Sequence, residues 1–368
     1  MTTPTAESAL HVGIDGRAFT SPAAGIRRYA RGLTAALTTL DGVRVTVIGG
    51  DPAAMPPGTA VQPEAPHPPG NPGWVLVGLP RSAARAGVDV LHTLAYTAPF
   101  LAAMPVVVTV HDVSYARHPE WYPHQRDWVR RAYYRLSARR ADAVVTPSHF
   151  SASEIEAAYG LTASRVSVVP MGVEAAFGVH RGGEEPLPAG VREPFALHVG
   201  DVHARRNPGV VLRALASLDR RGAPPVQLVL AGVDRGEVEA LAAAAETGRV
   251  VGLGSVSEAT LLTLYRRAFV LVYPSRYEGF GFPLIEAMAS GLPVMASRAA
   301  SIPEVAGDAA LLVDPEDAGA WADGLVRLLA DDAFRAELVS RGRERAALFT
   351  WARTARLTLD VYRRVAGR

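Results

Sequence analysis

Two carboxylates separated by seven residues are the side chains in this sequence best placed to do chemistry. Glu278 and Glu286 lie in the string Tyr-Pro-Ser-Arg-Tyr-Glu-Gly-Phe-Gly-Phe-Pro-Leu-Ile-Glu, which begins at the end of the apolar run 269–273. That run is short, β-branched and aromatic, as expected of a strand buried in a parallel sheet. The pattern therefore predicts a strand that ends in a turn, with Glu278 in the turn and Glu286 in the helix that follows.

The turn between the two carboxylates suits close contact with a ligand. Gly279 and Gly281 allow a sharp change of backbone direction, and Pro283 fits the first position of a helix. The first N–H groups of that helix have no partners within it and lie at the positive end of its dipole, so they favour a phosphate group. Carboxylates beside a phosphate would repel it unless they bind hydroxyl groups instead. The residues thus indicate a ligand in which a sugar is joined to a nucleotide by a diphosphate.

The complete string resembles the signature of the retaining glycosyltransferases of family 4, which have the GT-B fold. In this chain it reads Pro-Ser-x-Tyr-Glu-Gly-Phe-Gly-Phe-Pro-x-x-Glu-Ala-Met-Ala-x-Gly-x-Pro-Val. The resemblance implies an α/β protein with two doubly wound Rossmann-like domains facing a cleft. It also implies that Glu278 contacts the sugar and Glu286 the ribose of a nucleotide-sugar donor. The residues of the turn assigned to the same donor site are Gly279, Phe280, Gly281 and Phe282.

Two adjacent arginines follow the apolar run 195–199 in the second half of the chain. That run ends at Gly200, and Arg205 and Arg206 come shortly before the next helix. Guanidinium groups at a strand end can bind a diphosphate and stabilise the negative charge that grows on it as it leaves. The family has a lysine where this chain has Arg206, a departure that keeps the charge and changes the geometry. The resemblance further assigns Gly254 to the donor site, in a loop that holds the base.

In the first half, His111 follows the buried run 105–110. Ligands of open α/β sheets bind beyond the carboxyl ends of the strands. The string His-Asp-Val-Ser-Tyr also resembles a family segment whose histidine faces the donor sugar. Gly25, between the first strand and the first helix, is expected on the acceptor side, although the second glycine of the family's loop is Arg27 here. The residues that we expect to act in catalysis are His111, Glu278, Arg205 and Arg206.

Short apolar strands alternate with helices twice along the chain, which predicts two domains. Residues 1–178 are expected to form an acceptor-binding domain, and residues 195–349 a nucleotide-sugar-binding domain. The segment 179–194 is rich in glycine, proline and charge and is expected to be the linker. A helix within residues 350–368 would, in the GT-B fold, pack back on the first domain. Residues 51–80 are rich in proline and glycine and predict a long surface loop.

The composition excludes several other kinds of protein. The 368 residues contain no cysteine, so disulfides, thiolate metal sites and a cysteine nucleophile are ruled out. No Asp-x-Asp motif occurs, and we expect neither a metal ion nor a cofactor besides the donor. All 38 basic residues are arginine, but the net charge of +2 argues against a nucleic-acid partner. A polar N-terminus and the lack of a long apolar run predict a cytoplasmic protein.

Residues 126–140 carry six arginines and allow two interpretations. Trp128, Val129, Tyr133 and Leu136 are interleaved with the arginines at helical spacing. A helix could bury its aromatic side in the core and leave its arginines in water. Alternatively, a basic amphipathic helix could lie on the inner face of a membrane, where a lipid-linked acceptor would be found.

The sequence leaves the donor, the acceptor and part of the activity open. The family strings look closest to mannosyl- and rhamnosyl-type members, so GDP-mannose is the expected donor, with a glycan, glycolipid or small molecule as acceptor. The departures at Arg27 and Arg206 would also fit a nucleotide-sugar-binding protein without transferase activity. A nicotinamide-dependent dehydrogenase would need Gly-x-Gly-x-x-Gly after its first strand, and this chain lacks that motif.

Overall fold

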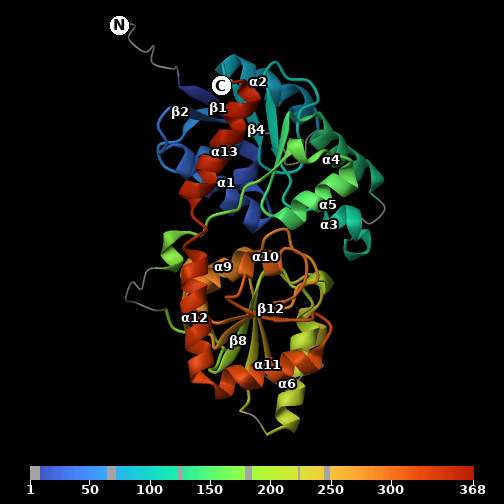
Figure 1. The fold of residues 1–368 in the computed structure, drawn as a ribbon, viewed down its shortest axis with the longest axis vertical. Coiled ribbons are helices and arrows are strands. Elements are labelled where there is room, and N and C mark those ends of the chain that lie inside the picture. The colour runs from blue at the N-terminus through green and yellow to red at the C-terminus, as the bar shows by residue number, and fades with distance from the viewer. Residues whose placement is uncertain (1–8, 64–71, 123–126, 179–184, 223, 244–248) are drawn as a thin grey trace. The chain divides into compact units, whose positions relative to one another are not determined.

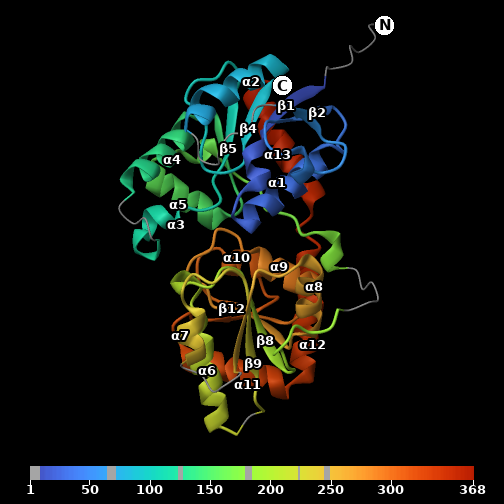
Figure 2. The same ribbon diagram turned by 180° about the vertical axis from the view of Figure 1, so that it is seen from behind.

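The chain forms two compact units, each built on a parallel sheet with helices on its faces (Figures 1 and 2). The computed structural model describes residues 9–63, 72–122, 127–178, 185–222, 224–243 and 249–368. The first unit comprises Met1–Gly172 and Thr350–Arg368, and the second Val173–Phe349. Residues 179–184 of the predicted linker, and Arg126, lie outside the described residues. The predicted α/β fold with two doubly wound sheets is confirmed.

The N-terminal unit contains a seven-stranded sheet in the order β3-β2-β1-β4-β5-β6-β7. Its strands are β1 (Leu10–Asp15), β2 (Val43–Ile48), β3 (Ala60–Gln62), β4 (Val90–Thr93), β5 (Val106–Thr109), β6 (Ala143–Thr146) and β7 (Val166–Val168). All neighbouring strands are parallel. The order reverses between β1 and β4, and in such sheets ligands bind at the carboxyl ends of the strands beside the reversal.

Helices cover this sheet, and some of them have clear end signals. They are α1 (Ala24–Leu37), α2 (Leu79–Ala86), α3 (Ser114–Arg117), α4 (Trp128–Arg140), α5 (His149–Tyr159) and α13 (Trp351–Ala366). For example, the hydroxyl of Ser148 accepts a hydrogen bond from the Ser151 N–H at the start of α5, and Gly160 ends that helix with a φ of 66°. Such caps satisfy backbone groups that the helix itself leaves unpaired.

The prediction of one long surface loop over residues 51–80 is wrong in part. Ala60–Gln62 form β3, which pairs in parallel with β2 at the edge of the sheet. The π-helical turn Trp74–Gly78 leads into α2, which begins at Leu79. Residues 64–71 lie outside the described residues. A three-residue edge strand between prolines carries no periodic signal in the sequence, because only its pairing with β2 defines it.

The C-terminal unit contains a six-stranded parallel sheet in the order β10-β9-β8-β11-β12-β13. Its strands are β8 (Phe195–Val199), β9 (Gln227–Ala231), β10 (Val250–Gly254), β11 (Val270–Tyr273), β12 (Val294–Ser297) and β13 (Leu311–Val313). Its helices are α6 (Pro208–Arg220), α7 (Val238–Ala243), α8 (Glu258–Arg267), α9 (Phe282–Ala289), α10 (Ile302–Ala306), α11 (Ala318–Ala330) and α12 (Asp332–Ala346). Here the strand order reverses between β8 and β11.

The C-terminal helix α13 belongs to the N-terminal unit, where it packs against α1 (Figure 1). Trp351, its first residue, lies against Gly32 of α1, where an added Cβ would come within 2.1 Å of the indole ring. Farther along α13, the Tyr362 hydroxyl lies 2.6 Å from Nδ1 of His92 in β4. The helix therefore reaches the sheet through both packing and hydrogen bonding.

His92 is fully buried in this contact between α13 and the sheet. Its Nε2 lies 2.8 Å from the Thr109 hydroxyl, so both ring nitrogens have a partner. Burial, with a smaller contribution from the nearby His111, lowers the pKa of His92 to about 3. The ring is consequently neutral in the folded protein at pH 5, whereas an unfolded histidine, with a pKa near 6.5, binds a proton there.

Acidification should therefore destabilise the fold through His92. Because the pKa of His92 is lower in the folded state than in the unfolded state, the stability that comes from its neutral, buried ring is fully present above pH 6.5. It is lost as the pH falls toward 3. Between pH 7 and pH 5 the loss amounts to about 2 kcal/mol. Urea unfolding at the two pH values measures it. In His92→Gln, the free energy of unfolding should differ less between the two pH values, by about that amount.

Candidate functional site

In the C-terminal unit, two loops meet where the strand order reverses. The first follows β8 and carries Arg205 and Arg206 in the short 3₁₀ helix Ala204–Arg206, and the second follows β11 and carries Glu278. The two loops are joined directly, because the Arg276 N–H donates to the Arg205 carbonyl over 2.9 Å. The sequence placed these residues at strand ends, and the order of the sheet makes the two strands neighbours.

Arg206 is the centre of this arrangement. Its Nη1 lies 2.9 Å from Oε1 of Glu278 and also donates to the hydroxyl of Tyr273, the last residue of β11. The guanidinium carbon lies 5.3 Å from the centroid of the same tyrosine ring. Gly200 also lies against the guanidinium group: its φ is 122°, and an added Cβ would lie 3.2 Å from the guanidinium carbon. A glycine is needed there both for the backbone conformation and for the space that Arg206 occupies.

The ion pair of Arg206 and Glu278 is largely buried, with side chains that are 14% and 7% exposed. Burial by itself lowers the pKa of Arg206, but Glu278 and Tyr273 raise it, and the net effect is a pKa above the usual value. Among the described residues, Nε of Arg206 has no hydrogen-bond partner, and Oε1 of Glu278 makes no hydrogen bond beside its ion pair. Buried polar atoms of this kind are normally satisfied, so they suit oxygens or hydroxyls of a ligand.

Two histidines beside the arginines are uncharged at neutral pH. Burial lowers the pKa of His203 to about 4, and Arg205 and Arg206 lower it in the same direction. Burial likewise lowers the pKa of His198, in β8, to about 3, with a further contribution from Arg206. The positive charge at these strand ends therefore comes from the two arginines.

The turn after Glu278 leads into α9 as the sequence predicted, although the helix begins at Phe282, one residue before the expected Pro283. Gly281 precedes the helix with a φ of 102°, a conformation that favours glycine. The Ser301 hydroxyl donates to the Glu278 carbonyl over 2.8 Å, and the same hydroxyl lies 3.3 Å from the Phe280 carbonyl. The segment after β12 thus holds the turn after β11.

The aromatic side chains of the turn lie close together. The ring of Phe280 is 5.8 Å from that of Phe282 and 5.6 Å from that of Phe349, in edge-to-face geometry. Phe280 is buried. Its role in this structure is to anchor the turn, which also contains Gly279.

Glu286 lies apart from the Arg206–Glu278 pair, in the second turn of α9. It is fully buried, and the hydroxyl of Tyr265 in α8 donates to its Oε2 over 2.8 Å. Tyr265 is itself held edge-on by Phe177, with ring centroids 5.7 Å apart. Gly254 is also separate, at the end of β10, where its carbonyl accepts a hydrogen bond from Gly232 over 2.8 Å.

In the N-terminal unit, His111 follows β5 and lies beside β4. Its Nε2 is 2.9 Å from the carbonyl oxygen of Leu94. A carbonyl only accepts hydrogen bonds, so Nε2 carries the hydrogen and Nδ1 of the neutral ring is an acceptor. Burial lowers the pKa of His111 to about 4, although Leu94 and Asp112 act in the opposite direction. The ring of Tyr29 packs edge-on at 5.1 Å and fixes the orientation of the imidazole.

The expected acceptor loop is ordered by a residue that departs from the family pattern. Gly25 is exposed in the first turn of α1. Arg27, at the position of the family's second glycine, donates from Nη1 to the Ser21 carbonyl. The arginine thus ties the helix start to the segment before it, which a glycine cannot do.

Sequence reasoning missed the side chains that hold the candidate residues in place, namely Tyr273, Tyr265 and Ser301. A buried tyrosine hydroxyl needs a polar partner, and this requirement was the available signal for Tyr273 and Tyr265. Their partners are distant in the sequence and became evident only in the fold. Within the described part of the chain, no three His, Asp or Glu side chains are grouped as ligands for a metal ion.

Both halves of the chain match known families. Residues 23–177 match the model described as Glycosyltransferase Family 4, and residues 184–345 the model described as Glycosyl transferases group 1. The O-antigen chain mannosyltransferase B of Escherichia coli is 33% identical over 265 residues, which cover 70% of each chain. The D-inositol 3-phosphate glycosyltransferase of a Nocardioides species is 35% identical over 246 residues, 61% of this chain and 54% of that protein.

Solved structures share the fold over nearly the whole chain. Sucrose-phosphate synthase from Thermosynechococcus elongatus has a TM-score of 0.75 at 24% identity, covering 97% of this chain and 99% of that one. Anabaena HepE in complex with UDP and glucose has a TM-score of 0.70 at 19% identity, covering 96% and 99%. Together with the two family matches and the 70% coverage of the Escherichia coli relative, these likenesses identify the chain as a GT-B glycosyltransferase of family 4, with a group 1 glycosyl transferase match in its second half.

Proposed function

We propose that this glycosyltransferase moves a hexose, mannose, from a nucleoside-diphosphate sugar to a hydroxyl of a glycan, glycolipid or small molecule. The observation that carries the proposal is the buried contact between Arg206 and Glu278, at the strand ends where ligands of such sheets bind. A cation and a carboxylate side by side match a diphosphate next to sugar hydroxyls. The name of the Escherichia coli relative supports mannose.

In this proposal the protein stabilises the departing diphosphate without a metal ion. Negative charge grows on the diphosphate as its bond to the sugar breaks, and preorganised cations lower the energy of that transition state. Arg205, Arg206 and the N-terminus of α9 supply the positive charge. Tyr273 and Gly200 fix Arg206 in advance, so little reorganisation is required when the donor binds.

Arginine is a workable replacement for the lysine of the family. A guanidinium group has five N–H donors in a planar fork, whereas an ammonium group has three around a point charge. In this structure Nη1 of Arg206 contacts Glu278 and Tyr273, and the other donors of the fork can bind phosphate oxygens. The departure is therefore consistent with transfer, and not only with binding of a nucleotide sugar.

The remaining candidates bind the donor's hydroxyls. Glu278 is proposed to receive hydrogen bonds from the sugar, and Glu286 from the ribose. The acceptor nitrogen Nδ1 of His111 is proposed to receive one from a substrate hydroxyl. Tyr265 would hold Glu286 in one rotamer for that purpose. Retention of configuration follows the resemblance to the family, and we assign no covalent nucleophile. The alternative of a nicotinamide-dependent dehydrogenase finds no support in the family matches.

Turnover with defined donors tests the proposal. GDP-mannose and UDP-glucose are each incubated with the protein and with mannose oligosaccharides or inositol 3-phosphate, in the presence of EDTA. We expect transfer from GDP-mannose, undiminished by EDTA, with a product whose anomeric signals in NMR show the α configuration of the donor. A β-linked product would refute retention, and activity lost in EDTA would refute the metal-free mechanism. Donor binding without any turnover would favour the nucleotide-sugar-binding alternative.

Two substitutions of Arg206 distinguish the effect of its positive charge on kcat from the effect of its guanidinium geometry. Arg206→Ala should lower kcat by about 10²- to 10³-fold, as for loss of one group that stabilises a transition-state charge. Arg206→Lys should recover most of that loss, because it restores the charge. Arg221→Ala, which removes an exposed arginine paired with Asp323 in the same unit, is the matched control and should leave kcat unchanged. An Arg206→Ala enzyme with normal kcat would remove the arginine from the mechanism.

The bond between Tyr265 and Glu286 should matter for donor binding more than for chemistry. Tyr265→Phe keeps the packing against Phe177 and removes the donor to Oε2 of Glu286. Loss of one such bond to a charged group costs about 1.5–3 kcal/mol. We expect the KM for the donor to rise at least tenfold with little change in kcat. An unchanged KM with a lower unfolding temperature would show that the bond serves stability alone.

A further inference from the structure

The outward face of α4 carries large apolar side chains. Trp128 is 69% exposed, Val129 58% and Leu136 39%. Because residues four apart lie on the same side of a helix, Trp128, Ala132 and Leu136 form one stripe, and Val129 lies on the same face two turns before Leu136. The stripe therefore runs along the helix on its solvent side.

The opposite face of α4 is packed into the N-terminal unit. The ring of Tyr133 lies 5.5 Å from that of Phe100, and the ring of Tyr134 stacks on Tyr96 at 5.1 Å. Ser137 is fully buried on the same side. Tyr133 and Tyr134 therefore agree with the first interpretation of this segment, in which the aromatic side of the helix faces the core. Trp128, Val129 and Leu136 do not agree with it, because they are exposed.

A further exposed apolar residue belongs to the loop that packs on α4. Leu101 is 82% exposed and follows Phe100, whose ring packs on Tyr133 of α4. Across the described residues, seven large apolar side chains are exposed, and four of them are these: Leu101, Trp128, Val129 and Leu136. Isolated exposed apolar residues need no explanation, but their concentration on one helix and its neighbouring loop indicates a binding surface.

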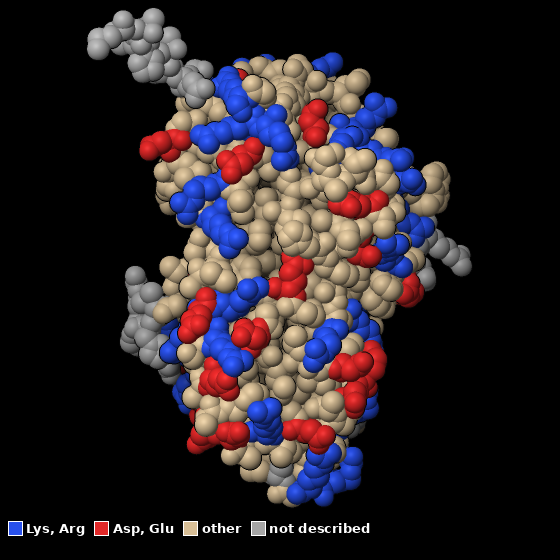
Figure 3. Space-filling view, in the orientation of Figure 1, with Lys and Arg blue, Asp and Glu red and all other residues tan. Residues whose placement is uncertain are grey.

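Arginines flank the stripe. Arg135, Arg139 and Arg140 are exposed on the same side of α4, and no described carboxylate lies within ion-pair distance of any of them. The acidic residue at the start of the helix, Asp127, caps it and pairs with Arg130. In the space-filling view, arginines follow the edge of the N-terminal unit along which α4 runs (Figure 3).

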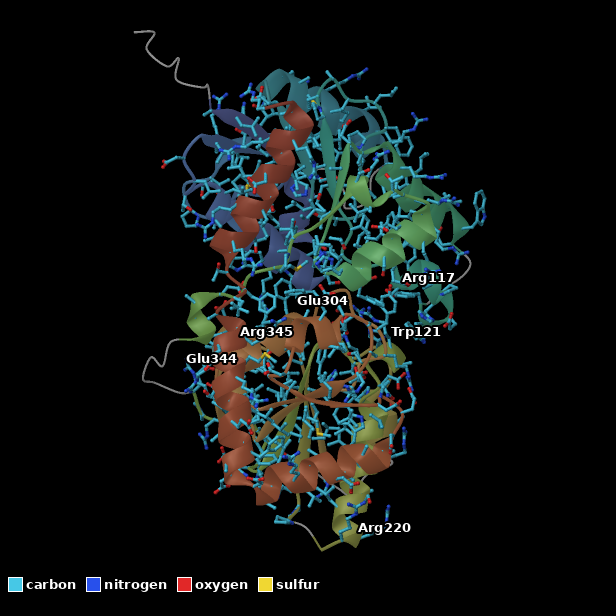
Figure 4. The ribbon with its side chains drawn as sticks, in the orientation of Figure 1. Arg117, Trp121, Arg220, Glu304, Glu344 and Arg345 are labelled. Carbon is cyan, nitrogen blue, oxygen red and sulfur yellow. The ribbon has the colours of Figure 1, made fainter. Side chains whose placement is uncertain are left out.

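Neighbouring side chains that might extend this surface are occupied within the fold. Arg117 of α3, labelled in Figure 4, binds the carboxylate of Glu154 in α5, with Nε 2.9 Å from Oε2. The indole of Trp121 stacks on His118 with ring centroids 4.0 Å apart. The surface is thus confined to the outward face of α4 and Leu101.

We propose that this face binds the surface of an anionic lipid bilayer. The apolar stripe would enter the boundary between headgroups and acyl chains, and Arg135, Arg139 and Arg140 would lie among the phosphates. An amphipathic helix with aromatic and basic residues binds membranes in this way, parallel to their plane. No helix in the described segments is long and apolar enough to cross a membrane, so the contact is peripheral.

The size of the surface favours a bilayer over a protein partner. A stable protein interface takes about 20–30 residues from each side. Four apolar side chains and three arginines fall well short of that, but they are enough for reversible membrane binding, in which each basic residue strengthens binding about fivefold. This proposal does not depend on the donor or the reaction.

Vesicle binding of the full chain tests it. Cosedimentation with vesicles of equal parts phosphatidylglycerol and phosphatidylcholine should show binding that weakens with salt, and vesicles of pure phosphatidylcholine should bind weakly. The triple variant Arg135→Gln, Arg139→Gln, Arg140→Gln should lose about a hundredfold in affinity. The matched control is Arg81→Gln, Arg220→Gln, Arg356→Gln, which removes the same charge from exposed arginines elsewhere and should bind like the wild type.

Tryptophan fluorescence reports whether the stripe itself enters the bilayer. A blue shift of the emission on adding the anionic vesicles is expected in the wild type and should disappear in Trp128→Phe, which still binds. Since Trp128 is exposed, this variant should fold normally. Absence of vesicle binding, or equal losses in the two triple variants, would overturn the proposal. So would binding of RNA or of a protein through these arginines in the absence of vesicle binding.

Discussion

The contact between Arg206 and Glu278 is the interaction on which the candidate donor site depends. It forms because β8 and β11 are neighbours in the sheet, although more than seventy residues separate the two side chains. Burying a charge is costly unless an opposite charge and further polar groups accompany it. Tyr273 supplies such a group, and Gly200 leaves the space for the guanidinium. Removing either charged side chain would leave the other buried without an opposite charge. The charge pattern therefore depends on the order of the sheet and on the geometry of the two loops.

The rest of the C-terminal unit keeps this pair in place and presents other groups near the same strand ends. The backbone bond between Arg276 and Arg205 joins the two loops, and Ser301 holds the turn after Glu278. Glu286 is positioned separately, by Tyr265. The N-terminal unit supplies His111 in a neutral form with a defined acceptor nitrogen, because burial and the Leu94 carbonyl fix its protonation. Each unit thus offers preformed groups suited to hydroxyls or phosphates.

The sequence alone predicted two α/β domains and placed Glu278, Arg206 and His111 after the ends of strands. These predictions were possible because buried parallel strands and glycine-rich turns have distinctive local sequence patterns. It was not sufficient for the pairing of Arg206 with Glu278 and Tyr273, which depends on the order of strands in the sheet. Strand β3 was missed because three residues carry no period. The sequence also did not predict which face of α4 is buried, because arginines and aromatic residues occur on all sides of the helix. Only the packing of Tyr133 on Phe100 and of Tyr134 on Tyr96 identifies the buried face.

The most direct test of the donor site is the thermal unfolding of the protein with GDP, UDP, dTDP, ADP or NAD, without metal, for the wild type and Glu286→Ala. A ligand that binds only the folded state at a hundredfold excess over its Kd adds about 2.7 kcal/mol of stability, which raises the Tm by several degrees. Comparing each protein with and without ligand removes any effect of the substitution on stability itself. The account predicts that one nucleoside diphosphate raises the Tm of the wild type and not of Glu286→Ala. A shift with NAD alone, or no shift with any nucleoside diphosphate in a folded protein, would contradict it.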